Sequence, residues 1–248
     1  MSYDEETPPA GVVPRAPLPP QTMNDTDTLR IYEKAMLLIL KDQEGTVGIS
    51  FYNYALAGAL LSELFLEERL IAEGKHHTLI VSDPTPVGDE LLDECLGLIG
   101  ASPKERAAQH WISHIAGIKD LKDRIARRLC QRDILREDED KVLLFFTRKI
   151  YPEVDPEPEQ ALIAELEEAI FTDTDEITPH TVALVSLGNS VGLLNSTFDR
   201  KKLKGRKERL EAIANGEVAG AACAASAAAQ QAMNAAIFVC IILPTIIT

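Results

Sequence analysis

The chain has 248 residues, which is enough for one sizeable hydrophobic core or two small ones. Its formal net charge of -14 excludes a general nucleic-acid binder, because such proteins need basic surface to displace counterions from phosphate. Its 46% hydrophobic content is that of a globular protein, and four widely spaced cysteines without a CxxC pair exclude a disulfide scaffold.

Residues 1–27 contain six prolines and few apolar anchors, so we expect a disordered tail. The tail is acidic and lacks the basic start and apolar core of a secretory signal peptide. We expect residues 28–248 to form one helical domain. An apolar stripe from Ile31 to Ile39 predicts its first helix, and Gly45 suits the turn that follows.

Residues 55–94 form the most informative segment, which reads as helix, hairpin, turn and second helix. Apolar residues between Leu56 and Phe65 follow helical spacing. The β-prone residues at 70–71 and 78–81 flank a turn that contains glycine, a pattern typical of a hairpin.

The turn after this hairpin carries an acidic cluster, which suggests either a metal site or acid–base chemistry. The cluster contains Asp83, Asp89, Asp93 and Glu94. Proline at 84 and 86 ends the preceding strand, because it donates no ladder hydrogen bond. Asp89 stands where a helix begins, so it is well placed as the N-terminal cap. We therefore interpret the cluster as structural.

The next segment predicts two further helices. Ser102 can cap the first, with Pro103 in its first turn and Glu105 completing a capping box. This helix carries Trp111 and ends at Gly117. The second runs through apolar positions from 121 to 129.

A β-prone run at residues 141–151 predicts a strand or hairpin that ends at Pro152. Helices are expected from about Glu159 to Phe171, and again from the Thr178-Pro179 pair. The predicted fold class is thus mainly α: a single compact multi-helix domain with one or two small β-hairpins.

The C-terminal part combines a basic run at residues 200–209, an alanine-rich stretch and an apolar end at 235–247. The basic run is either a nonspecific contact to anionic lipid or a solvated helix. The apolar end is too short for a membrane-spanning helix, which needs about 20 residues. We interpret it as a buried terminal helix, with a tail anchor as the alternative.

No motif for catalysis, a cofactor or a nucleotide is evident, so we expect neither an enzyme nor a cofactor. His110 and His114 lie one helical turn apart, a spacing that can chelate zinc. No glutamate follows His110 in an HExxH pattern and no third ligand is near in sequence, so a surface pair is favoured.

Taken in order, these segments resemble the Golgi phosphoprotein 3 family from about Leu29 to Val239. The most specific piece is Thr85-Pro86-x-Gly88-Asp89-x-Leu91-Leu92-Asp93-Glu94. Others are Lys41-Asp42-Gln43-Glu44-Gly45, Trp111-Ile112, Leu143-Leu144-Phe145 and Tyr151-Pro152. The resemblance implies a helical, peripheral membrane protein that recognises phosphatidylinositol 4-phosphate. It implies an adaptor on the cytosolic face of the Golgi if the host is eukaryotic, and the family also has bacterial members.

The resemblance also implies which residues bind the lipid headgroup. Tyr52, or Phe51, replaces the tryptophan of eukaryotic members, and two basic positions fall on Lys119 and Lys122, with Arg124 close by. A third basic position falls on Ala57, which is uncharged. This departure favours the alternative of a membrane-independent adaptor or scaffold whose lipid site has decayed.

The residues themselves agree with such a site. Lys119 and Lys122 stand three residues apart, so on one helix they would sit at the edge of its apolar stripe and converge on one phosphate. Each basic group near an anionic membrane contributes about 1 kcal/mol. The alternative is a solvated basic flank of an amphipathic helix.

We expect the β-prone run at 141–151 to contact the membrane or a second subunit. Its apolar residues, among them Leu144, Phe145 and Phe146, either insert at the acyl boundary or contact a second subunit in a homo-oligomer. Arg148 fits an interfacial position, because basic side chains reach headgroups. The alternative is an ordinary core strand.

Overall fold

A computed structural model describes residues 29–41, 45–47, 52–74, 77–142 and 146–218. The expected tail at 1–27, the alanine-rich stretch and the apolar end at 235–247 lie outside these residues. Helices dominate the described part, which confirms the predicted fold class. They are α1 (Ile31–Ile39), α2 (Tyr52–Leu66), α3 (Glu90–Gly100), α4 (Ala108–Ala116), α5 (Leu121–Gln131), α6 (Glu157–Phe171), α7 (Pro179–Val191), α8 (Leu194–Thr197), α9 (Arg200–Gly205) and α10 (Lys207–Ala214).

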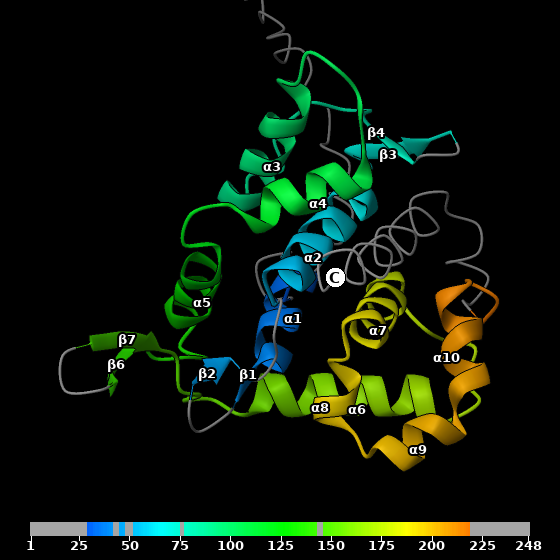
Figure 1. The fold of residues 1–248 in the computed structure, drawn as a ribbon. Helices are drawn as coiled ribbons and strands as arrows, with labels where there is room; N and C mark the ends of the chain where they lie inside the picture. Colours follow the sequence, from blue (N-terminus) through cyan, green and yellow to red (C-terminus); the bar gives the residue numbers. More distant parts are fainter. Residues whose placement is uncertain (1–28, 42–44, 48–51, 75–76, 143–145, 219–248) are drawn as a thin grey trace, which may run out of the picture.

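Helix α2 is the centre of the fold and packs against α1, α3, α4, α5 and α7 (Figure 1). It is buried along almost its whole length because apolar side chains occupy all of its faces, as expected for a core helix. Small residues between Ala55 and Ala59 allow its neighbours to approach closely. Helix α5 and the hairpin after it lie on one side of the molecule, and α9 and α10 lie on the other (Figure 1).

Three small antiparallel sheets border the helices within the described residues. The predicted hairpins at 70–81 and 141–151 are confirmed, although the second begins at Asp138 rather than at Lys141. A short pair of antiparallel strands on either side of Gly45 was not predicted. Gly45 itself has a positive φ of 57°. The strands are β1 (Leu40–Lys41), β2 (Thr46–Val47), β3 (Leu70–Glu73), β4 (Thr78–Val81), β5 (Arg106–Ala107), β6 (Asp138–Val142) and β7 (Phe146–Ile150).

The predicted capping box at Ser102 is wrong. Helix α4 begins at Ala108, and the Ser102 hydroxyl instead donates to the Lys104 carbonyl oxygen at 2.6 Å. The residues in between pair with β4, with Ala107 opposite Thr78. Sheet pairing therefore takes the backbone groups that a helix from Ser102 would have used, and Glu105 remains exposed.

Other predicted helix ends are confirmed. The Asp89 carboxylate accepts hydrogen bonds from the backbone N–H groups of Leu91 and Leu92 at 3.0 and 3.1 Å. Gly117 follows α4 as its C-cap, and Thr178 caps α7. Among the described helices, none has the length and apolar character needed to cross a membrane.

Candidate functional site

Helix α5 is the basic element of an acidic protein. Its apolar positions, such as Ile125 and Leu129, are fully buried against the core. The rest of its surface carries a series of basic side chains, which is the pattern of an amphipathic helix with a charged outer face. These residues are Lys122, Arg124, Arg127 and Arg128, with Arg132 directly after the helix.

Lys119 is exposed and lies before the helix, since α5 begins at Leu121. Asp120 between them has a left-handed backbone with φ of 55°. The prediction that Lys119 and Lys122 share one helical face is therefore wrong, because a turn places Lys119 and the helix places Lys122. The Asp120 side chain makes no capping hydrogen bond, and the acidic residue in the first turn of α5 is Asp123.

Lys122 is half-buried rather than free in solvent. Its Nζ lies 3.1 Å from the Asp123 carboxylate and 5.3 Å from the centroid of the Tyr151 ring, a cation–π contact. Tyr151 is fully buried, and its backbone N–H donates to the Gly45 carbonyl oxygen at 2.9 Å. Burial and the Asp123 carboxylate raise the pKa of Tyr151, so its phenol stays neutral. The ammonium of Lys122 is thus held in one place.

Arg124 does not join the lysines. Its guanidinium reaches two carboxylates of α3, that of Glu90 at 2.7 Å and that of Glu94 at 2.6 Å. Arg124 follows Lys122 by two positions, about 200° around the helix axis. The structure therefore brings Lys122 to Tyr151 and Arg124 to α3, on different sides of α5.

The two expected headgroup positions on α2 differ in access. Tyr52 is the first residue of α2 and is partly buried against the core, while Phe51 lies outside the described residues. Ala57 is completely buried, at 0% exposure. A basic side chain at this position would have no route to solvent, so the uncharged residue fits its surroundings.

The hairpin tip cannot be compared with its prediction, because Leu144, Phe145 and the side chain of Phe146 lie outside the described residues. Arg148 is exposed on β7. It forms hydrogen bonds of 3.0 and 2.7 Å from Nε and Nη2 to the Asp140 carboxylate on β6. The basic group is therefore present at the surface, with an acidic partner across the strands.

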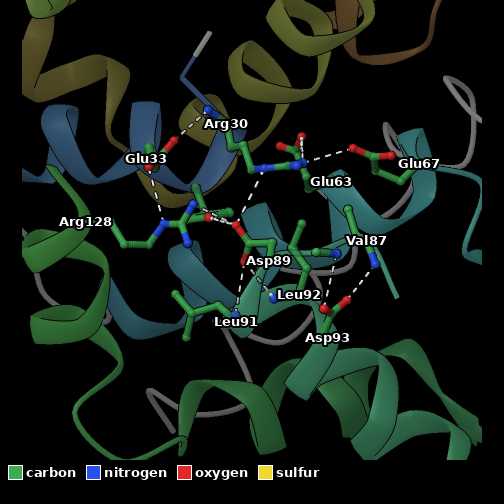
Figure 2. A network of polar contacts seen from close by, with 12 residues as sticks. Arg30, Glu33, Glu63, Glu67, Val87, Asp89, Leu91, Leu92, Asp93 and Arg128 are labelled. Atoms are coloured by element: carbon green, nitrogen blue, oxygen red, sulfur yellow. Dashed lines mark hydrogen bonds and ion pairs between the residues drawn. The ribbon is translucent and has the colours of Figure 1, made fainter. Parts of the chain in front are cut away.

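A buried polar network beside α5 was not predicted (Figure 2). Three carboxylates, those of Glu33, Glu63 and Asp89, are only 1–3% exposed. Arginine side chains reach in from the surface, with Arg128 Nη2 at 2.8 Å from Asp89 and Arg30 Nη1 at 3.2 Å from Glu63.

Further contacts complete the network. The Tyr32 hydroxyl donates to Asp89 at 2.6 Å, and Arg128 Nε donates to Glu33 at 3.4 Å. The backbone N–H of Ile31 donates to Glu63 at 2.7 Å. Each buried carboxylate thus has a guanidinium and a backbone or phenol donor, which is what a buried charge requires. The network connects α1, α2, α3 and α5, and we interpret it as structural.

A signal for this network exists in the sequence. Glu33 and Glu63 interrupt apolar helical stripes, and a charged residue at a core position needs a partner. The arginine partners of these glutamates are distant in sequence: Arg128 follows Glu33 by 95 residues. No local pattern connects them.

The basic run at 200–209 divides into two parts. Arg206 and Arg209 turn inward to the end of α6, where Arg206 Nε donates to the Ile170 carbonyl oxygen at 2.8 Å and Arg209 Nε to that of Ala169 at 3.1 Å. They satisfy the unpaired carbonyl groups of that helix end. Residues 200–202 and Lys204 remain exposed on α9, across the molecule from α5 (Figure 1).

This division predicts different effects within the run. Arg206→Ala should lower the free energy of unfolding by about 1.5 kcal/mol, since it leaves carbonyl groups of α6 without their charged donor. Lys201→Ala, on the exposed part, should change it by less than about 0.5 kcal/mol. Urea unfolding followed by circular dichroism measures both. Equal effects would contradict the capping role.

His110 and His114 stack, with ring centroids 5.6 Å apart. Burial and the nearby Arg106 lower the pKa of His110. Within the described residues no group of three metal-ligating side chains is found.

The model of a family described as Golgi phosphoprotein 3 (GPP34) matches residues 31–236 of the chain, a range that contains all the described helices, from α1 to α10.

Proposed function

Because the chain belongs to the Golgi phosphoprotein 3 family, we propose that it is a non-enzymatic peripheral membrane protein that binds the headgroup of phosphatidylinositol 4-phosphate. Tyr52, Lys119 and Lys122 contribute the contacts. The protein then works on the cytosolic side of a membrane, as an adaptor at the Golgi if its host is eukaryotic. The hairpin of β6 and β7, with Arg148 at its surface, serves as a second membrane contact or as a contact between subunits.

One observation carries this proposal: the start of α5 offers fixed positive charge. Lys122 is held over the Tyr151 ring with the single carboxylate of Asp123 beside it, Lys119 stands exposed in the preceding turn, and the residue before the helix makes no side-chain cap. Anions bind favourably at such helix ends. Lysine meets a phosphate as a point charge rather than through a bidentate fork, so weak and reversible attachment is expected. Arg124 is left out of the site because two carboxylates of α3 occupy it.

A membrane-independent scaffold of the same fold is the second candidate, and the buried Ala57 favours it. At this position a basic contact to the headgroup is missing. A scaffold would keep the helical framework and lose the dependence on lipid.

Liposome flotation separates the two candidates. We expect the full chain to float with vesicles that contain phosphatidylinositol 4-phosphate and not with matched vesicles of phosphatidylinositol. Changing both Lys119 and Lys122 to alanine removes about 2 kcal/mol of attraction and should lower partitioning roughly thirtyfold.

A double variant of Lys104 and Arg136 to alanine is the control, since both side chains are exposed and neither belongs to the proposed headgroup site. It removes the same formal charge and should leave flotation unchanged. Equal flotation on both kinds of vesicle would refute headgroup recognition. Absence of flotation on either would favour the scaffold.

A further inference from the structure

A small polar cavity lies between the start of α3 and the outer side of α5. Its volume is about 290 Å³. Its lining consists of Glu90, Leu91, Arg124, Arg127, Arg128 and Gln131. Three of the lining side chains carry a guanidinium group and one carries a carboxylate, and the other carboxylates that pair with these arginines, those of Glu33, Asp89, Glu94 and Glu137, are not part of the lining. It is separate from the Lys122 site, because Lys122 turns to Tyr151 instead.

The arginines differ in how much of their hydrogen-bonding capacity is used. Arg128 uses Nε and Nη2 on the buried carboxylates Glu33 and Asp89, which fixes its guanidinium. Arg127 uses Nε on Glu137 at 3.3 Å, and its side chain is 46% exposed. The terminal nitrogens of Arg127 and Nη1 of Arg128 therefore keep donors for a further acceptor.

The ion pair between Glu90 and Arg124 is weak. Its carboxylate lines the cavity and holds Arg124 Nη2 at 2.7 Å, yet its side chain is 82% exposed. Such a solvated carboxylate is worth little as an ion pair and is readily exchanged for a stronger anion. A dianionic phosphate that displaced it would meet the free donors of Arg127 and Arg128 and the Nη2 of Arg124, whose Nη1 stays on Glu94.

We propose that this cavity is a second anion site, which takes a phosphate group carried by a soluble phosphate monoester or by a lipid headgroup. The site goes beyond the proposed function, because it uses neither lysine of that site. The buried network orients Arg128, Arg127 supplies the free donors, and Glu90 is the carboxylate that the ligand replaces.

The test uses the full chain with inorganic phosphate as the probe, titrated by isothermal calorimetry at low ionic strength. Wild-type protein should bind in a saturable manner. Arg127→Ala should weaken binding about tenfold or more, the effect of one lost charge-assisted hydrogen bond. Glu90→Gln should strengthen binding instead, because it removes the competing charge. Arg136→Ala, an exposed arginine outside the cavity, is the matched control and should bind like wild type.

Lys122→Ala separates this site from the lysine site, because it should leave in place the component of phosphate binding that Arg127→Ala removes, and the double variant should lose both components. Flotation then distinguishes the sources of the phosphate. If a lipid headgroup is the ligand, Arg127→Ala lowers flotation on vesicles with phosphatidylinositol 4-phosphate. If the ligand is soluble, flotation stays unchanged while phosphate binding falls. Wild-type protein without saturable binding, or variants of Arg127 and Glu90 that bind like wild type, would overturn the proposal.

Discussion

Replacing Asp89 with alanine should lower the free energy of unfolding by about 3–5 kcal/mol, the effect of removing one partner from a buried ion pair. Asp89 is 2% exposed, and its single carboxylate makes three kinds of contact. It caps α3, accepts the Tyr32 hydroxyl and neutralises Arg128. Its loss leaves the fully buried Tyr32 phenol and the start of α3 without their acceptor and removes one of the two carboxylates that hold Arg128, which keeps Glu33.

Urea unfolding followed by circular dichroism measures this effect, and two variants make it specific. Asp93→Ala removes a carboxylate one turn further along the same helix, which accepts from the backbone of Val87 and Gly88 nearer the surface. It should cost only about 1 kcal/mol. Asp89→Asn keeps an acceptor for the cap and loses the charge, so it should fall between the two. A result for Asp89→Ala no larger than that for Asp93→Ala would show that the buried charge is not what matters.

A second large effect is expected at Gly45, where alanine should lower the free energy of unfolding by about 3–5 kcal/mol. The φ of 57° is unfavourable for a residue with a side chain, and an added Cβ would overlap the backbone of Tyr151 and Pro152. Backbone atoms cannot rotate aside as a side chain does. The strand end that holds Tyr151 beneath Lys122 would have to move.

Gly74→Ala provides the comparison, because Gly74 has a similar φ of 69° and open space where its Cβ would stand. Only the backbone conformation is penalised there, which predicts about 1–2 kcal/mol. Thermal and urea unfolding of both variants give the difference that is due to the clash. Tryptophan fluorescence from Trp111, in α4, reports whether the core survives. Equal losses for the two glycines would contradict the close approach to Tyr151.

The elements that the sequence predicts well are those with a local cause. Apolar spacing identifies α1 and α2, and Asp89 and Thr178 mark helix starts through their own side chains. Ser102 shows the limit of such reasoning. Its capping pattern is good, yet β5 pairs with β4, a competitor about 25 residues earlier in the chain, and the helix starts later.

The site was harder to predict for the same reason. Lys122 follows from helical spacing, but its fixed position depends on Tyr151, which the hairpin of β6 and β7 brings back to α5. Arg124 is close to Lys122 in sequence but pairs with α3, because the two side chains leave α5 on different sides of the helix. The cavity at Arg127 is not visible in the sequence, because its wall comes from two helices whose packing no local pattern specifies.

The buried network around Asp89 also bears on how the chain reaches its fold and leaves it. Its long-range pairs are separated by 32 to 99 positions, and no partial structure with fewer than four helices in place can complete it. Contacts of such long range form late, after most loop-closure entropy has been lost. Interactions that form after the transition state slow unfolding more than they speed folding. We therefore expect the network to slow the unfolding of this helical domain more than it speeds its folding.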